Sequence, residues 1–209
     1  MINQNYIWLA LFIIVYGNFF YLRDTLKGET KPNRVTFILW GIAPLITFFA
    51  QKEGGGSIQI LYTLLIALAP IVIFAASFHD KNAYWKISKF DVSCGIISIL
   101  ALVLLVITNN PLLALWFSVL ADLFAAIPTL IKSYKYPLTE TTTAYAFEVI
   151  GSVIVLLTIH NWILVNYLFA AYTLLTNALF TSLQIFSPKN VGRRHGFIAS
   201  RLKAYIKNQ

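Results

Sequence analysis

Seven long apolar runs follow one another along the chain, separated by short polar connections. A helix needs about 20 mostly apolar residues to cross a bilayer, with roughly 17 to 25 tolerated. The runs are residues 6–22, 35–50, 58–78, 92–107, 111–131, 142–159 and 162–186. They are continuously apolar rather than alternating, which favours helices over the strands of a membrane barrel. The pattern predicts an all-α, polytopic membrane bundle of seven helices.

The composition supports a membrane protein and excludes several other classes. Of the 209 residues, 58% are hydrophobic and 11% are charged, whereas an ordinary soluble domain carries about 25% charged residues. A soluble domain and a disordered chain are therefore excluded. The single cysteine, Cys94, permits no internal disulfide. The net charge of +8 does not indicate nucleic-acid binding, because the basic residues lie between and after the apolar runs.

Lysine and arginine are distributed unequally between the two sides that seven alternating spans define. Fifteen of the 16 lie in the first, third and fifth connections or after the last run, and the opposite side receives only Lys52. Cytoplasmic loops carry an excess of basic residues. The sequence therefore predicts a multi-pass protein of the cell (plasma) membrane, with its N-terminus outside and its C-terminus in the cytoplasm.

The first three runs can be laid over the last three. Residues 6–22 fall on 115–131, a shift of 109, and residues 30–35 fall on 139–144. The fourth run lies between the triplets, so both cross the membrane in the same direction, as parallel repeats. The alternative is a chance overlay that any seven-span protein would allow. The predicted parts are a first three-helix repeat (1–80), a linker with the fourth helix (81–110), a second repeat (111–186) and a basic cytoplasmic tail (187–209).

This 3 + 1 + 3 plan with an outer N-terminus resembles the PQ-loop superfamily, which includes the SWEET sugar transporters and the lysosomal amino-acid exporters. The resemblance covers roughly residues 6–186. The family's Pro-Gln pair is expected near the inner ends of the first and fifth helices. Pro128 is followed by Thr129 at the second site, and Phe19 and Phe20 occupy the first. The resemblance implies a small-solute transporter that works by alternating access, in which an asparagine of the seventh helix, here Asn177, contacts the substrate.

Two carboxylates lie inside predicted spans, Asp122 in the fifth and Glu148 in the sixth. An ionisable group near the bilayer centre costs about 2.5 to 3.5 kcal/mol on insertion scales, so such groups face the bundle or a water-filled cavity. Counting 1.5 Å per residue from the inner ends places them at heights of roughly 13 Å and 9 Å. The two side chains predict a site that binds and releases a proton. The alternative is a pair of hydrogen-bonded carboxyls that join two helices.

The seventh run carries a polar stripe of Asn166, Thr173, Asn177, Thr181 and Gln184. Polar side chains in a membrane helix either bond to a neighbouring helix or line a cavity, and both interpretations stay open here. On the sixth run, Tyr145 shares a helical face with Glu148. Trp40 lies away from the interfaces where tryptophan usually gathers, so it is either part of a pocket or packed in the core. The predicted substrate-binding residues are Asn177, Thr173, Asn166, Tyr145 and Trp40.

Prolines within the runs predict bending points. Pro44, Pro70 and Pro128 each leave a backbone carbonyl without its helical partner and so permit a helix to bend. Pro128 and Pro44 are the predicted hinges. Such prolines also occur in static membrane helices.

The remaining chemistry of the sequence points away from an enzyme. The three histidines lie on different sides of the predicted membrane, so no metal site is expected, and no cofactor motif is present. The preferred function is a small-solute transporter, with proton coupling as an option. The alternative is a non-transporting receptor or assembly factor whose basic tail binds lipid or a partner. The expected partners are the lipid bilayer and a small molecule of unknown identity, and a homo-oligomer stays open.

Overall fold

The computed structural model describes residues 1–83, 85–108 and 110–187, and these ranges contain helices but no strand. The prediction of an all-helical bundle is confirmed. The elements are α1 (Tyr6–Leu26), α2 (Arg34–Glu53), α3 (Ile60–Ala76), α4 (Lys89–Ile107), α5 (Pro111–Lys135), the 3₁₀ helix η1 (Pro137–Thr139), α6 (Thr142–Leu157) and α7 (Leu164–Ile185).

Polar residues just before the apolar runs set where three helices begin. The Asn33 side chain accepts hydrogen bonds from the backbone of the first turn of α2, and Asn110 does the same for α5. Ser88 and Asp91 form a reciprocal capping box at the start of α4. Each cap satisfies backbone N–H groups that have no partner within the helix.

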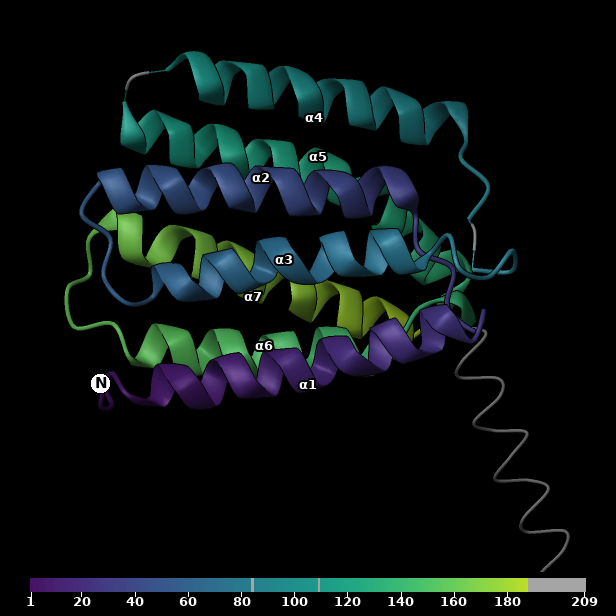
Figure 1. The fold of residues 1–209 in the computed structure, drawn as a ribbon, viewed down its shortest axis with the longest axis horizontal. Coiled ribbons are helices and arrows are strands. Elements are labelled where there is room, and N and C mark those ends of the chain that lie inside the picture. The colour runs from purple at the N-terminus through teal and green to yellow at the C-terminus, as the bar shows by residue number, and fades with distance from the viewer. Residues whose placement is uncertain (84, 109, 188–209) are drawn as a thin grey trace, which may run out of the picture.

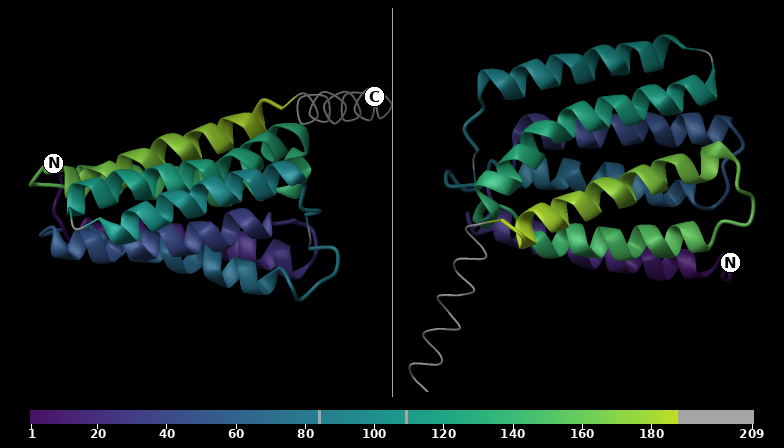
Figure 2. Two further views of the ribbon diagram at one scale, coloured as in Figure 1. Left: turned by 90° about the horizontal axis from the view of Figure 1, so that it is seen from above. Right: turned by 180° about the vertical axis from the view of Figure 1, so that it is seen from behind.

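The helices form two layers, visible as front and back in Figure 1 and edge-on in Figure 2. One layer holds α1, α3 and α2, the other holds α6, α7 and α5, and α4 covers one edge by packing on α5 and α2. Within the layers, α3 contacts α1 and α2, and α7 contacts α5 and α6. Between the layers, α1 packs on α6, α2 on α5 and α3 on α7. Exchanging α1 with α5, α2 with α6 and α3 with α7 therefore returns the same set of packed pairs among these six helices, while the pairs made by α4 have no counterpart.

The outer surface of the bundle is apolar, which indicates a membrane protein. Four described helices are long and apolar enough to cross a membrane, namely α1, α2, α5 and α7, and α3 and α6 are shorter apolar helices. Large hydrophobic side chains point outward, among them Phe12 (68% exposed) and Leu175 (71% exposed). Soluble monomers rarely expose apolar patches of such extent.

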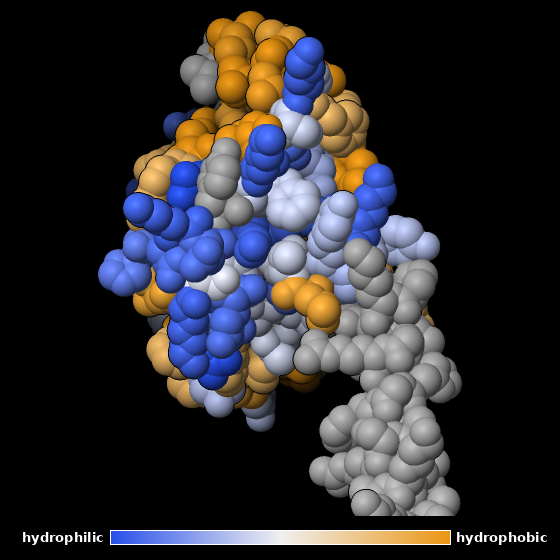
Figure 3. Space-filling model, turned by 90° about the vertical axis from the view of Figure 1, so that its right-hand side faces the viewer, coloured by the Kyte–Doolittle hydropathy of each residue, from blue (hydrophilic) through white to orange (hydrophobic). Residues whose placement is uncertain are grey.

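Charged residues gather at one end of the bundle. Every described lysine and arginine except Lys52 lies at the end where α1, α3, α5 and α7 finish and α2, α4 and α6 begin. We call it the basic end; it comprises the described residues 23–34, 77–83, 85–91 and 132–141. Figure 3 views this end, with hydrophilic side chains across the middle and hydrophobic ones towards the rim. The predicted tail lies outside the described residues from position 188 onward.

Candidate functional site

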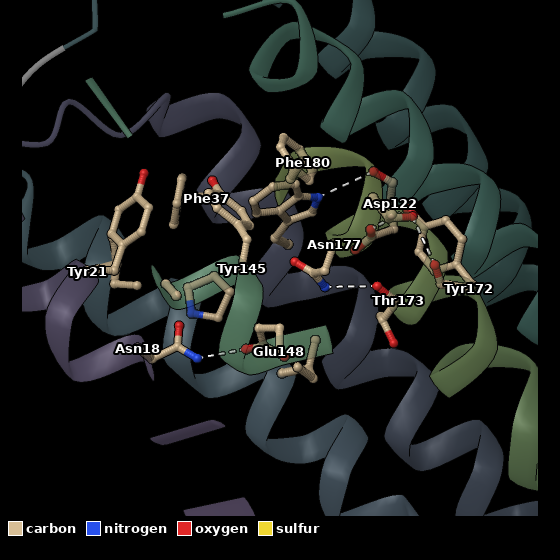
Figure 4. A pocket seen from close by; sticks show the side chains of 16 residues that line it. Asn18, Tyr21, Phe37, Asp122, Tyr145, Glu148, Tyr172, Thr173, Asn177 and Phe180 are labelled. Atoms are coloured by element: carbon tan, nitrogen blue, oxygen red, sulfur yellow. Dashed lines mark hydrogen bonds between the residues drawn. The ribbon is translucent and has the colours of Figure 1, made fainter. Parts of the chain in front are cut away.

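A cavity lies between the two layers, in the half of the bundle nearer the basic end. Its volume is about 70 Å³, measured as the space open to the centre of a water molecule. A single water needs roughly 10 to 15 Å³ on this measure, so the cavity holds several waters or one small solute. Residues of α1, α2, α3, α5, α6 and α7 line it, and α4 contributes none of the lining. Figure 4 shows the side chains around it.

The structure brings six of the predicted site residues together around this cavity. Two are the carboxylates of Asp122 and Glu148, which come from two helices of the same layer, α5 and α6. The other four line the same space: Trp40, Tyr145, Thr173 and Asn177. The helical spacing of polar side chains in α6 and α7 thus places these residues on inward faces.

Three predicted site residues lie elsewhere. Asn166 is at the end opposite the basic end, where its side chain accepts a bond from the Ser57 backbone (3.0 Å) and donates to the Asn161 backbone (2.9 Å). It therefore joins the α2–α3 and α6–α7 connections instead of lining the cavity. Pro44 and Pro128 lie within α2 and α5 but do not line the cavity, whereas Pro70 of α3 does.

Glu148 is held at one oxygen only. The Asn18 amide donates to its Oε1 (2.7 Å) and to the Ile14 backbone carbonyl (3.0 Å) of α1. The Oε2 atom is buried and has no hydrogen-bond partner. A buried acceptor without a donor is costly, so this oxygen marks a place where a proton or a ligand would be bound.

Asp122 has a separate partner. The Tyr172 hydroxyl of α7 donates to its Oδ2 (2.7 Å), and the indole of Trp40 donates to its backbone carbonyl (3.4 Å). The two carboxylates thus line one cavity but are held by different helices. Sequence reasoning missed Asn18 and Tyr172, because one polar residue in an apolar run carries no pattern of its own.

Aromatic rings form a continuous wall of the cavity. Tyr145 stacks on Phe180 with ring centroids 4.7 Å apart, and Trp40 meets Phe180 edge-on at 5.5 Å. Phe37 joins Trp40 at 5.4 Å and Tyr21 at 5.1 Å. Edge-on and stacked pairs of this kind are favourable ring geometries. The wall reaches from the middle of the bundle to the basic end.

A buried ion pair closes the cavity towards the basic end. Glu140, in the connection before α6, accepts bonds from the hydroxyls of Tyr21 (2.8 Å) and Tyr145 (2.7 Å) through Oε2. Its Oε1 accepts from Lys132 (2.5 Å), and the two side chains are 0% and 1% exposed. Lys132 also donates to the Lys31 backbone carbonyl. Sequence reasoning counted Lys132 only as a basic residue of a loop and gave Glu140 no role.

The opposite direction is closed by a second cluster. The buried Tyr62 hydroxyl is within hydrogen-bond distance of Ser152 (2.8 Å) and Thr173 (2.5 Å). Beyond it, apolar side chains of α1, α6 and α7 fill the bundle, including Ile7, Val155 and Phe169. The Glu140 and Tyr62 clusters therefore lie on opposite sides of the cavity along the bundle.

Comparison with known proteins yields no relative: no family model, no curated protein and no solved structure matches the chain significantly. Among the described residues, no group of three or more histidine, cysteine, aspartate or glutamate side chains is placed to hold a metal ion. The chemical character of the site thus comes from two carboxylates, several amide and hydroxyl groups, and an aromatic wall.

Proposed function

We propose that this chain is a seven-span transporter of a small solute that works by alternating access. The main support is the cavity between two three-helix layers, which is lined by Asp122 and Glu148 and lies between the Glu140 and Tyr62 clusters. A membrane protein has to bury or hydrate ionisable groups within its spans, and their usual setting is a pathway for ions or substrates. The proposed orientation has the basic end in the cytoplasm and the N-terminus outside a plasma membrane, as the basic residues favour.

The proposed architecture is a pair of parallel repeats with α4 as linker, as in the PQ-loop superfamily. The exchange of α1–α3 with α5–α7 supports it, because it preserves every packed pair among these six helices. Transporters with internal repeats bind their substrate at the interface between the repeats. In this chain the cavity occupies that interface, where α3 and α7 face each other.

Two closures alternate in the proposed cycle. At the inner end, Glu140 holds the hydroxyls of Tyr21 and Tyr145, which line the cavity. At the outer end, Tyr62 joins α3 to α6 and α7 through Ser152 and Thr173. Opening one cluster while the other stays closed exposes the cavity to one side at a time, and Pro44 and Pro128 are the proposed bending points.

The cavity residues divide into two roles in this proposal. Asp122 and Glu148 bind and release the coupling proton. Trp40, Tyr145, Thr173 and Asn177 contact the solute, because they line the same space. Asn166 bonds to the connection between α2 and α3, so we assign it no part in binding.

Purified protein reconstituted into liposomes tests the proposal. A pH-sensitive dye inside the vesicles reports proton movement while candidate sugars, amino acids and amines are added outside. We expect at least one solute to drive saturable proton flux that is lost in the Asp122→Asn, Glu148→Gln double variant. Absence of flux with every solute class would favour the alternative of a receptor or assembly factor, whose tail lies outside the described residues.

A further inference from the structure

The charged residues described in the cavity lining are all acidic. Asp122 and Glu148 line it, and none of its described lining residues is a lysine, arginine or histidine. The buried Lys132 is bound by Glu140, and Arg34 bonds to Ser77 and lies over the Phe78 ring. Neither of these cations is therefore left to balance the two cavity carboxylates.

One carboxylate oxygen is left without a hydrogen-bond donor. Glu148 is only 8% exposed, and its Oε2 has no hydrogen-bond partner although Oε1 is held by Asn18. Glu148 lies on the cavity wall in Figure 4, beneath Asn177 and beside Asn18. Buried carboxylates form their strongest bonds with ionised N–H donors, so an ammonium group is the ligand chemistry that suits this oxygen.

The aromatic wall suits the same charge. Five rings, those of Tyr21, Phe37, Trp40, Tyr145 and Phe180, adjoin one another around the cavity, and Tyr172 adds a sixth. The faces of aromatic rings attract cations, most strongly where water is excluded. Aromatic rings together with carboxylates form a recurrent environment for organic ammonium ions.

The other polar groups of the cavity lining offer few free hydrogen-bond donors and acceptors to a neutral or anionic solute. The Asn177 amide donates to the Thr173 backbone, the Thr176 hydroxyl donates to the Tyr172 backbone, and Thr173 is bound to Tyr62. A sugar needs many free donors and acceptors, whereas each of these groups already makes a hydrogen bond within the bundle and has fewer left to offer. An amino acid would bring a carboxylate for which the lining offers no cation, and an unpaired buried charge is costly.

We infer that the solute is a compact organic ammonium ion that carries no carboxylate, bound between Glu148, Asp122 and the aromatic wall. This inference rests on the proposed transport function and names its substrate class. The cavity has space for several waters, so it suits an ion with a similarly small number of non-hydrogen atoms. Because the ion and the coupling proton bind the same carboxylates, transport is an exchange of one for the other.

Three probes of nearly equal shape isolate the charge. They are tert-butylammonium, its uncharged counterpart tert-butanol, and α-aminoisobutyrate, in which a carboxylate replaces one methyl group. Binding to the purified protein in lipid nanodiscs is measured by calorimetry at constant ionic strength. We expect saturable binding of tert-butylammonium and an affinity at least tenfold weaker for the other two probes. Equal affinity for tert-butanol, or tighter binding of α-aminoisobutyrate, would overturn the inference.

Variants locate the site. Glu148→Gln and Asp122→Asn keep the size of each side chain and should each weaken tert-butylammonium binding at least tenfold, since a charged partner is removed from a buried pair. Glu53→Gln, at the opposite end of the bundle and exposed, should bind like the parent protein. Unchanged affinity in both cavity variants would overturn the assignment, and the selectivity among the three probes tests it even if a variant fails to fold.

Uptake of radiolabelled tert-butylammonium into proteoliposomes distinguishes the ligand class from the transport function. Protein-free liposomes are the control for leak of the neutral amine. Binding with saturable uptake into proteoliposomes supports both. Binding without uptake would contradict the transport function while leaving the ligand class in place. Uptake of a sugar or an amino acid in preference to the ammonium ion would contradict the ligand class while leaving the transport function in place.

Discussion

Lys132 and Glu140 form a buried ion pair that we expect to be important for stability. Both side chains are buried, and the pair joins α5 to the connection before α6. Removing one partner of a buried pair leaves an uncompensated charge, which costs about 3 to 5 kcal/mol. We expect Lys132→Met to lower the free energy of unfolding by that amount, measured by chemical denaturation in detergent.

The exposed pair of Arg23 and Asp24 is the matched control. The Arg23 side chain is 44% exposed, and surface pairs contribute about 0 to 1 kcal/mol. Arg23→Gln should therefore change the unfolding free energy by less than about 1 kcal/mol. Equal losses in the two variants would mean that Lys132 and Glu140 are not the buried link described above.

We expect that replacing the cavity carboxylates removes the effect of a pH gradient on uptake. Asp122→Asn and Glu148→Gln remove the exchangeable proton but keep the side-chain shape, and a buried ionisable group is itself costly. Both variants should stay folded. At least one should abolish the acceleration of uptake by a pH gradient, while exchange at saturating solute remains. Uptake in proteoliposomes with and without a gradient measures this, and wild-type pH dependence in both variants would contradict it.

Among single residues, the sequence predicts those site residues that form a pattern. It does not predict site residues that form none. Asp122 and Glu148 could be identified because charges are rare within apolar runs. Thr173 and Asn177 could be identified because their spacing follows the helix. Tyr21 and Phe180 could not, because an aromatic side chain in an apolar run is equally suited to lipid, core or cavity. The contacts of Glu140 and Asn166 depend on how separate connections meet in space.

Among the elements, the α1–α6 contact depends on small residues. A side chain added at Gly151 would overlap Ile14, and one added at Gly17 would overlap Phe147. Such residues let membrane helices approach closely. We expect Gly151→Val to force α1 and α6 apart and to lower stability by about 1 to 3 kcal/mol.

The neighbouring position provides the control for this helix contact. Ile150 is 48% exposed on the outer face of α6, so Ile150→Val should change stability by less than about 0.5 kcal/mol. Thermal unfolding of both variants in the same detergent makes the comparison. A larger effect of the Ile150 substitution would contradict the proposed packing of α1 against α6.

The existence of the seven helices could be predicted from hydropathy, but their ends could not. The fourth apolar run begins at residue 92, whereas α4 begins at Lys89, because Ser88 and Asp91 cap the helix. The first run ends at residue 22, whereas α1 continues to Leu26 through polar residues. Hydropathy detects the part of a helix that faces lipid, while caps and connections decide where the helix stops.

The distribution of basic residues over the whole molecule predicts a single orientation in the membrane. In a Cys94→Ala background, a cysteine at Glu53 lies at the end opposite the basic end, and one at Lys81 lies on the basic end; both positions are exposed. An impermeant thiol reagent outside the cell should label the first and spare the second, because basic loops stay in the cytoplasm. Labelling of the cysteine at Lys81 alone would mean that the protein has the opposite orientation.

Alternating access itself can be measured at one cavity residue. Thr176 lines the cavity, and the hydroxyls of Thr30 and Thr141, 2.7 Å apart, join two connections at the basic end. In a Cys94→Ala protein carrying Thr176→Cys, a small impermeant thiol reagent should react from both sides of the membrane, by way of the two open states. Oxidative cross-linking of added cysteines at Thr30 and Thr141 should stop reaction from the basic side and preserve reaction from the other. Reaction from the basic side that persists after cross-linking, or no reaction from either side before it, would contradict a transporter built around this cavity.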